Sequence, residues 1–239
     1  MKITIPSDYR VAFTTALSIA RLIECGRFAE AFDVIQFSEE AKAASLKWGT
    51  DLERRREILQ RCENTLIIGG FKPDTQQIEV IDDLAANFKA PDQPTYALEV
   101  DDKQCAVLVR ALESYQRLAL GQVDEPLEHF CIYRTPDARE RDLEVLNDMR
   151  HLAMHSGGAS FGIMSFLLPD DVRNGRQAQK VLEHHLAHKR NPNGGVTHRF
   201  DNPLRMRLGG CTGQDISIYD PEFMPRAKND GSLSSGPRF

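Results

Sequence analysis

The sequence has no long hydrophobic run, since no apolar stretch in its 239 residues approaches the roughly 20 residues that a transmembrane helix needs. The amino terminus also lacks the basic and apolar segments of a signal peptide. Hydrophobic residues (41%) and charged residues (27%) occur at the levels typical of a soluble globular protein. We therefore expect a cytoplasmic protein that does not bind a membrane.

Cysteine is scarce and lacks any paired pattern. The five cysteines are scattered, and no Cys-x-x-Cys pair occurs, so the sequence supports neither a disulfide framework nor a zinc ribbon. Cys25, Cys62 and Cys105 fall within apolar helical patterns, which predict buried free thiols.

Motifs that carry well-known chemistry are also missing. The sequence contains no phosphate-binding G-x-x-x-x-G-K-[ST], no G-x-G-x-x-G after a strand and no G-x-S-x-G nucleophile elbow. Its paired carboxylates, such as Asp101-Asp102 and Asp170-Asp171, are better explained as caps at helix starts. The sequence therefore predicts no catalytic residue and no cofactor, and it favours a non-catalytic protein over an enzyme.

Two His-x-x-x-His pairs, His151/His155 and His184/His188, invite a metal-site interpretation, because residues four apart lie on one helix face. Neither pair carries the glutamate of a His-Glu-x-x-His motif, and no third ligand is evident. His185 rather than His184 continues the apolar face of its helix, which indicates packing. We predict no metal site, and a metal-dependent hydrolase that uses these pairs stays an alternative.

Periodicity organises the first half of the chain. It predicts a strand over Lys2–Ile5, a helix from Ser7-Asp8 to Glu24 that Gly26 ends, and a second amphipathic helix from Phe28 to Lys47. A third helix is expected over Asp51–Cys62.

The next segment changes in character. Two β-rich runs within Asn64–Ile81 flank glycine and proline turn signals, which predicts a hairpin or two neighbouring strands. A short helix is expected over Asp82–Asn87, and the two prolines of Ala90–Pro94 mark the best candidate for an internal boundary.

A similar pattern then begins again. Leu98–Val100 predicts a strand and Cys105–Leu120 a helix, and a long helix is expected over Arg139–Met154. Pro169-Asp170-Asp171 predicts the start of a helix that reaches Arg190. The alternating segment Val196–Phe200 is expected to pair as a strand with Asp215–Tyr219.

The two halves align without a gap when they are shifted by 95 residues, which places Ile3 on Leu98 and Gly26 on Gly121. We interpret this match as a remote duplication, although helical convergence would give a similar number of identities. We predict a helix-dominated α+β fold of two weakly repeated strand–helix–helix halves, with short strands and a loop-rich carboxyl-terminal segment. The expected units are an amino-terminal half (1–90), a carboxyl-terminal half (95–224) and a flexible tail (225–239).

Positive charge gathers in one stretch of an acidic protein. Val172–Gly210 holds eight Lys/Arg against two carboxylates, whereas the whole chain has a net charge of −5. Arginine forks match phosphate and carboxylate groups, and a glycine pair can offer backbone amides to an anion. A solvated basic surface, or an interface with the acidic half, is the open alternative. The predicted ligand-binding residues are Phe161, His184, Arg190, Gly194, Gly195, His198, Arg199, Phe200, Arg205 and Arg207.

Three motifs stand out in the second half: ALESYQRLALGQVDE (Ala111–Glu125), SFGI (Ser160–Ile163) and QKVLEHHLAHKRNPNGGVTHRFDNPLR (Gln179–Arg205). Together they resemble a family of small, mostly uncharacterised proteins encoded by bacteriophages and prophages. The resemblance covers roughly Ala111–Arg205 and implies a location in the host cytoplasm but no established chemistry. His188 stands where the family would have an aromatic residue, which weakens the metal interpretation.

Phage accessory proteins of this size often resemble antagonists of host defence, including proteins that sequester nucleotide signals. The leading hypothesis is a viral accessory protein that binds a small anionic, nucleotide-like ligand and removes it from a host defence pathway. An inhibitor that binds a host protein is a further alternative. The acidic total and the pI near 5.8 disfavour nucleic acid as a partner. The sequence leaves the ligand, the host target and a homo-oligomer open.

Overall fold

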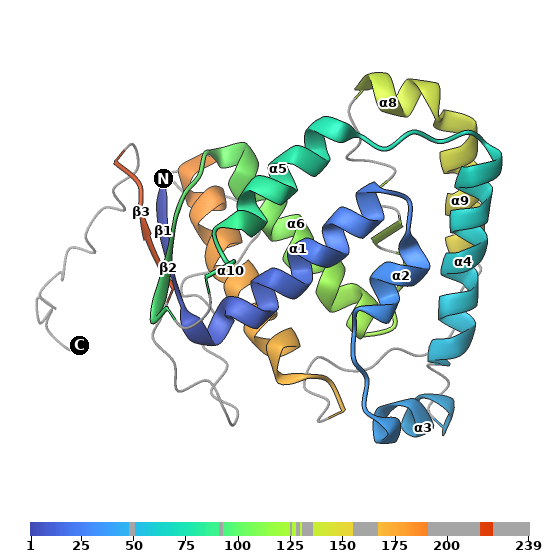
Figure 1. The fold of residues 1–239 in the computed structure, drawn as a ribbon, viewed down its shortest axis with the longest axis horizontal. Helices are drawn as coiled ribbons and strands as arrows, with labels where there is room; N and C mark the ends of the chain where they lie inside the picture. Colours follow the sequence, from blue (N-terminus) through green and yellow to red (C-terminus); the bar gives the residue numbers. More distant parts are fainter. Residues whose placement is uncertain are drawn as a thin grey trace, which may run out of the picture.

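Helices make up most of the described part of the chain, and a small sheet lies at one end of them (Figure 1). The computed structural model describes residues 1–47, 51–90, 93–124, 126–127, 130, 136–154, 167–190 and 216–221, apart from the side chains of 150–154. Within these ranges the elements are β1 (Lys2–Pro6), η1 (Ser7–Tyr9), α1 (Arg10–Glu24), α2 (Phe28–Asp33), α3 (Glu39–Lys47), α4 (Leu52–Ile68), α5 (Thr75–Ala86), β2 (Thr95–Glu99), α6 (Asp102–Ala119), α8 (Pro136–Arg141), α9 (Leu143–Met154), α10 (Asp170–Arg190) and β3 (Ser217–Tyr219).

The sheet is antiparallel, with β1 between β2 and β3. Ile3 of β1 pairs with Leu98 on one side and with Ile218 on the other. Ile3 and Ile5 are fully buried and alternate with the more exposed Lys2 and Thr4, as a half-buried strand requires. The predicted partner of β3, Val196–Phe200, lies outside the described residues.

Three helices that contact one another lie at the centre of the molecule, and among them α6 packs against both α1 and α10 (Figure 1). Helix α1 buries only apolar side chains, among them Phe13, which stacks on Phe88 with a ring-centroid distance of 5.3 Å. Gly175 of α10 lies where the three helices meet, facing Ala12 of α1 and Leu112 of α6. The predicted helix-dominated α+β fold is confirmed.

The structure repeats along the chain at the predicted shift of 95 residues. Gly26 after α1 and Gly121 after α6 have φ values of 74° and 79°, a left-handed conformation that favours glycine. The Gly26 amide donates to Ile23 O and the Gly121 amide to Leu118 O, each at 2.9 Å. The residues before and after the two glycines also repeat their hydrogen bonds. Both segments thus form a strand, a helix and the same glycine turn, while common ancestry stays a hypothesis.

The prediction of strands within Asn64–Ile81 is wrong. Helix α4 continues to Ile68, and α5 begins after Asp74, whose side chain accepts a hydrogen bond from the Gln77 amide at 3.3 Å. The buried side chains of this part of α4 are Leu59, Cys62 and Leu66, which recur at helical spacing. Ile67 and Ile68, which made the run look like a strand, are instead 70% and 86% exposed.

Three further helix boundaries differ from the prediction. The segment Phe28–Lys47 splits into α2 and α3, because Ser38 Oγ accepts a hydrogen bond from the Ala41 amide and so caps a new helix. The segment Arg139–Met154 starts earlier and divides into α8 and α9 at the buried residue Asp142. The expected short helix over Asp82–Asn87 is the end of α5.

Other predicted boundaries are confirmed. Helix α10 runs from Asp170 to Arg190, and Asp101 caps α6 in a reciprocal capping box with Gln104. The proposed division at Ala90–Pro94 stays a prediction, and β1 and α1 pack against β2 and α6 across it.

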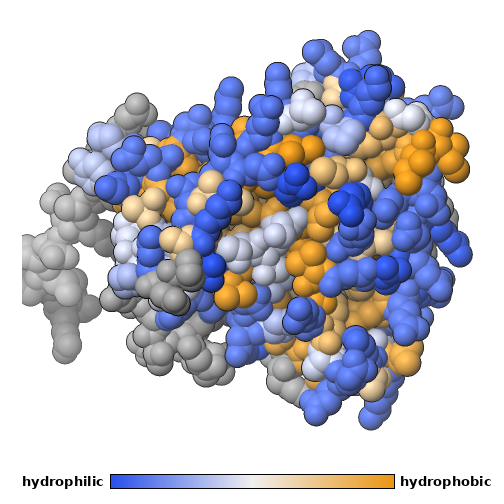
Figure 2. All heavy atoms as spheres, in the orientation of Figure 1, coloured by the Kyte–Doolittle hydropathy of each residue, from blue (hydrophilic) through white to orange (hydrophobic). Residues whose placement is uncertain are grey.

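Apolar surface remains exposed at the α4 and α9 end of the molecule, where Ile67, Ile68 and Leu143 lie (Figure 2). No helix in the described part of the chain is long and apolar enough to cross a membrane.

Candidate ligand-binding groove

A groove with a volume of about 1180 Å³ runs along α6, between α5 and α10. Six cationic side chains line it: Lys103, Arg110 and Arg117 from α6, and Arg176, Lys180 and Arg190 from α10. Three carboxylates, of Asp101, Glu113 and Glu183, also line it. The groove therefore carries an excess of positive charge on a protein that is acidic overall.

Helices α6 and α10 run in opposite directions along this groove, and polar contacts fix their register. At one end, Tyr115 Oη donates to Asp171 Oδ2 at 2.6 Å. At the other end, Lys189 Nζ lies 2.9 Å from Asp102 Oδ1. The beginning of each helix therefore lies beside the end of the other.

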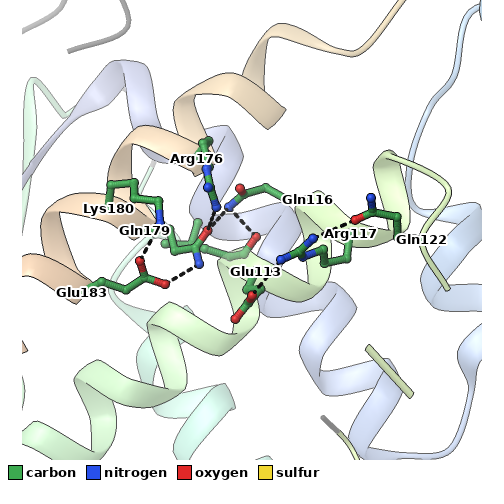
Figure 3. Close-up of polar contacts among 9 residues, drawn as sticks. Glu113, Gln116, Arg117, Gln122, Arg176, Gln179, Lys180 and Glu183 are labelled. Atoms are coloured by element: carbon green, nitrogen blue, oxygen red, sulfur yellow. Dashed lines mark hydrogen bonds and ion pairs between the residues drawn. The ribbon is translucent and has the colours of Figure 1, made fainter. Parts of the chain in front are cut away.

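A buried glutamine pair joins the two helices between these ends (Figure 3). Gln116 and Gln179 are 3% and 1% exposed, and Gln116 Nε2 donates to Gln179 Oε1 at 2.8 Å. The same Gln179 oxygen accepts from Arg176 Nη1 at 3.2 Å, and Gln179 Nε2 donates to Glu183 Oε1 at 2.5 Å. Buried polar groups need such partners, and the pair thereby orients two charged side chains that line the groove.

The cations differ in how far carboxylates neutralise them. Lys180 Nζ lies 3.0 Å from Glu183 Oε2, and Arg117 Nη2 lies 3.5 Å from Glu113 Oε1 (Figure 3). Among the described residues, Lys103, Arg176 and Arg190 have no carboxylate at ion-pair distance. Within the described ranges, these three positive charges are therefore not neutralised by an ion pair.

Only two of the residues predicted from the sequence to bind a ligand fall within the described chain. Arg190 lines the groove, as the last residue of α10. His184 lies on another face of α10, where its ring centroid is 4.3 Å from that of His188. The remaining predicted residues lie outside the described residues: Phe161, Gly194, Gly195, His198, Arg199, Phe200, Arg205 and Arg207.

Most of the cations that line the groove are not among the residues predicted from the sequence to bind a ligand. Lys103, Arg110 and Arg117 recur every seven residues on α6, which places them along one helix face. That spacing could have indicated a row of cations, but charged residues on the outer face of an amphipathic helix usually just face solvent. Their functional interest appears only once α10 brings its own cations alongside.

A second polar cluster ties the end of β3 to the helices. His185 Nε2 lies 3.2 Å from Asp220 Oδ2, and Lys189 Nζ lies 3.1 Å from the same oxygen. Asp220 is 3% exposed, so these partners satisfy a buried carboxylate. His185 is thus a satisfied histidine, as its helical phase indicates. Within the described ranges, no group of three or more His, Cys, Asp or Glu side chains could hold a metal ion.

Two ionisable groups of α6 keep their protons at neutral pH. Burial raises the pKa of the Cys105 thiol to about 12, and the nearby Asp102 carboxylate adds to this effect. Burial also raises the pKa of Tyr115, to which the hydrogen bond with Asp171 contributes. Neither group supplies an anionic nucleophile at neutral pH.

Comparison of the chain with protein-family models, with curated proteins and with solved structures found no match.

Proposed function

We propose that this protein binds a small anionic, nucleotide-like ligand in the groove between α5, α6 and α10. The observation that carries the proposal is the presence in one groove of Lys103, Arg176 and Arg190, without a carboxylate at ion-pair distance among the described residues. An arginine fork that faces solvent can bind phosphate through two parallel hydrogen bonds. An anionic ligand would neutralise these charges.

The remaining lining favours a ligand with an uncharged part as well. Apolar side chains of Val80, Val107, Val109 and Leu186 line the same groove. Its volume of about 1180 Å³ exceeds the roughly 300–1,000 Å³ that is usual for a small-molecule pocket. A single inorganic ion would fill little of this space, whereas a nucleotide-sized molecule would use both the cations and the apolar wall.

The proposed activity is binding without conversion. His184 and His188 touch each other but would supply only two ligands, so we do not prefer a metal-dependent hydrolase. Removal of the ligand from a host defence pathway is the role that we attach to this binding. That role rests on the sequence resemblance alone.

Mass spectrometry of small molecules released by heating the purified protein tests the proposal most directly. We expect a phosphate-bearing compound in the released fraction, and a higher melting temperature when nucleotides are added to ligand-free protein. Combined Arg176→Ala and Arg190→Ala changes should abolish that increase. Arg54→Ala, which removes an exposed arginine of α4 that does not line the groove, is the matched control and should leave the increase intact. Retention of the full nucleotide response in the double variant would refute the groove as the binding site.

A further inference from the structure

Four of the six cations of the groove lie toward its two ends, and Arg110 and Lys180 lie between them. On α6, Lys103 and Arg117 are 14 residues apart, and on α10, Arg176 and Arg190 are also 14 residues apart. Fourteen residues make almost four helical turns, so each pair shares one face of its helix, with a separation of about 21 Å at 1.5 Å per residue.

The antiparallel packing brings these cations together in two groups. Arg190 follows Lys189, which forms an ion pair with Asp102, the residue before Lys103. At the other end, Arg176 donates to Gln179, which accepts from Gln116, the residue before Arg117. Each end of the groove therefore receives one cation from α6 and one from α10.

The middle of the groove has a different character. Lys180 is paired there with Glu183, whereas Glu113 pairs with Arg117, toward the second end. Apolar side chains of Val107 and Leu186 line the groove between its ends. Among the described residues, Lys103 and Arg190 at one end and Arg176 at the other thus have no carboxylate at ion-pair distance, whereas Lys180 between them does.

From this arrangement we infer that the ligand is an elongated molecule with a phosphate group near each end, about 20 Å apart, and a less charged part between them. A compact mononucleotide would satisfy only one of the two groups of cations. Lys103 with Arg190 would hold one phosphate, and Arg176, which lies near the Glu113-paired Arg117, would hold the other. This inference rests on the proposed function, because it concerns the ligand of the same groove.

Calorimetric titration with synthetic bisphosphates of increasing length tests the inference. Each compound carries one phosphate at each end of an uncharged polyethylene glycol chain, and the corresponding monophosphate serves as its half. Joining two binding groups can raise affinity by a factor of 10² to 10⁴ when the linker matches the distance between sites. We expect a bisphosphate that spans about 20 Å to bind at least tenfold more tightly than its half, and shorter ones to lose that gain.

Single variants locate the two ends. Arg190→Ala and Arg176→Ala should each reduce the affinity for the long bisphosphate to that of the monophosphate, whereas Arg54→Ala should change neither affinity. Arg190 is exposed, so its replacement tests one end without disturbing packing. If the monophosphate binds and every bisphosphate binds no more tightly, the two-ended site is refuted while the groove is retained. If neither type of compound binds, the proposed function fails, and the inference fails with it.

Discussion

Helix α6 packs against two helices, and the two contacts differ in chemistry. Helix α1 presents only apolar side chains among its buried residues, whereas α10 buries Gln179 and forms hydrogen bonds and ion pairs with α6. An apolar contact needs no particular orientation of its side chains, but a buried amide must find its partners. The α6–α10 contact therefore fixes the orientation of side chains that line the groove.

The largest loss of stability is expected when a buried apolar side chain of α1 is removed. Phe13→Ala should lower the free energy of unfolding by about 3–5 kcal/mol, because a fully buried ring that stacks on Phe88 is lost and a cavity is left. Urea denaturation followed by circular dichroism measures this loss. The nucleotide response of the remaining folded protein should be unchanged, and a loss of that response would show that the two contacts are not independent.

At the polar α6–α10 contact, we expect stability to be recoverable and anion binding not to be. Gln179→Met removes one of the two acceptors of Gln116 Nε2 and should lower the free energy of unfolding by about 1–3 kcal/mol. Adding Gln116→Met should restore most of this stability, since both partners then become apolar. Anion binding should stay weak in the double variant, because Arg176 has lost the oxygen that orients it. If the double variant bound anions as tightly as the wild type, the role of Gln179 in orienting Arg176 would be contradicted.

A smaller effect is expected at the end of the α6–α10 contact. Tyr115→Phe removes the hydrogen bond to Asp171 and should lower the free energy of unfolding by about 1–2 kcal/mol near pH 7. The pKa of Tyr115 is raised above its ordinary value of 10 in the folded state. The unfolded chain therefore releases this proton first, and stability falls as the pH rises above about 10.

The Phe variant should show a shallower alkaline decline than the wild type. Equilibrium denaturation between pH 8 and pH 11 measures both slopes. Cys105, whose raised pKa contributes a decline that begins near pH 9, is present in both proteins and serves as an internal reference. Identical slopes in the two proteins would contradict the assigned role of Tyr115.

The smallest expected effect is a gain in stability, at Gly175, where α1, α6 and α10 meet. A Cβ added at Gly175 would lie 3.7 Å from Leu112 Cδ2 and 3.8 Å from Ala12 Cβ, which are ordinary contact distances. Gly175→Ala should therefore raise the free energy of unfolding by about 0.5–1 kcal/mol, measured as a higher urea midpoint. Gly26→Ala is the contrasting control and should destabilise, since φ is 74° there and the added Cβ would lie 2.9 Å from Leu66 Cδ1.

The helices whose ends carry clear signals could be predicted from the sequence. Asp101 and Gln104 mark the start of α6, because they satisfy exposed backbone amides locally. Asp170 marks the start of α10, because an acidic side chain suits the positive end of a helix. The prediction of a strand before Gly69 is wrong, because isoleucine occurs in strands as well as in helices and packing decides between them. The packing of α4 against other elements leaves Ile67 and Ile68 exposed to solvent, which the sequence pattern does not indicate.

The candidate site divides in the same way. The sequence by itself placed Arg190 at the end of a basic helix within an acidic chain and so predicted an anion site near it. The tertiary structure alone decided that Lys103, Arg110 and Arg117 share a groove with α10, because these residues lie more than fifty positions away in the chain. Local signals set the bounds of a helix, but the buried contacts through which it packs, such as Gln116 with Gln179, set which of its charges lie together.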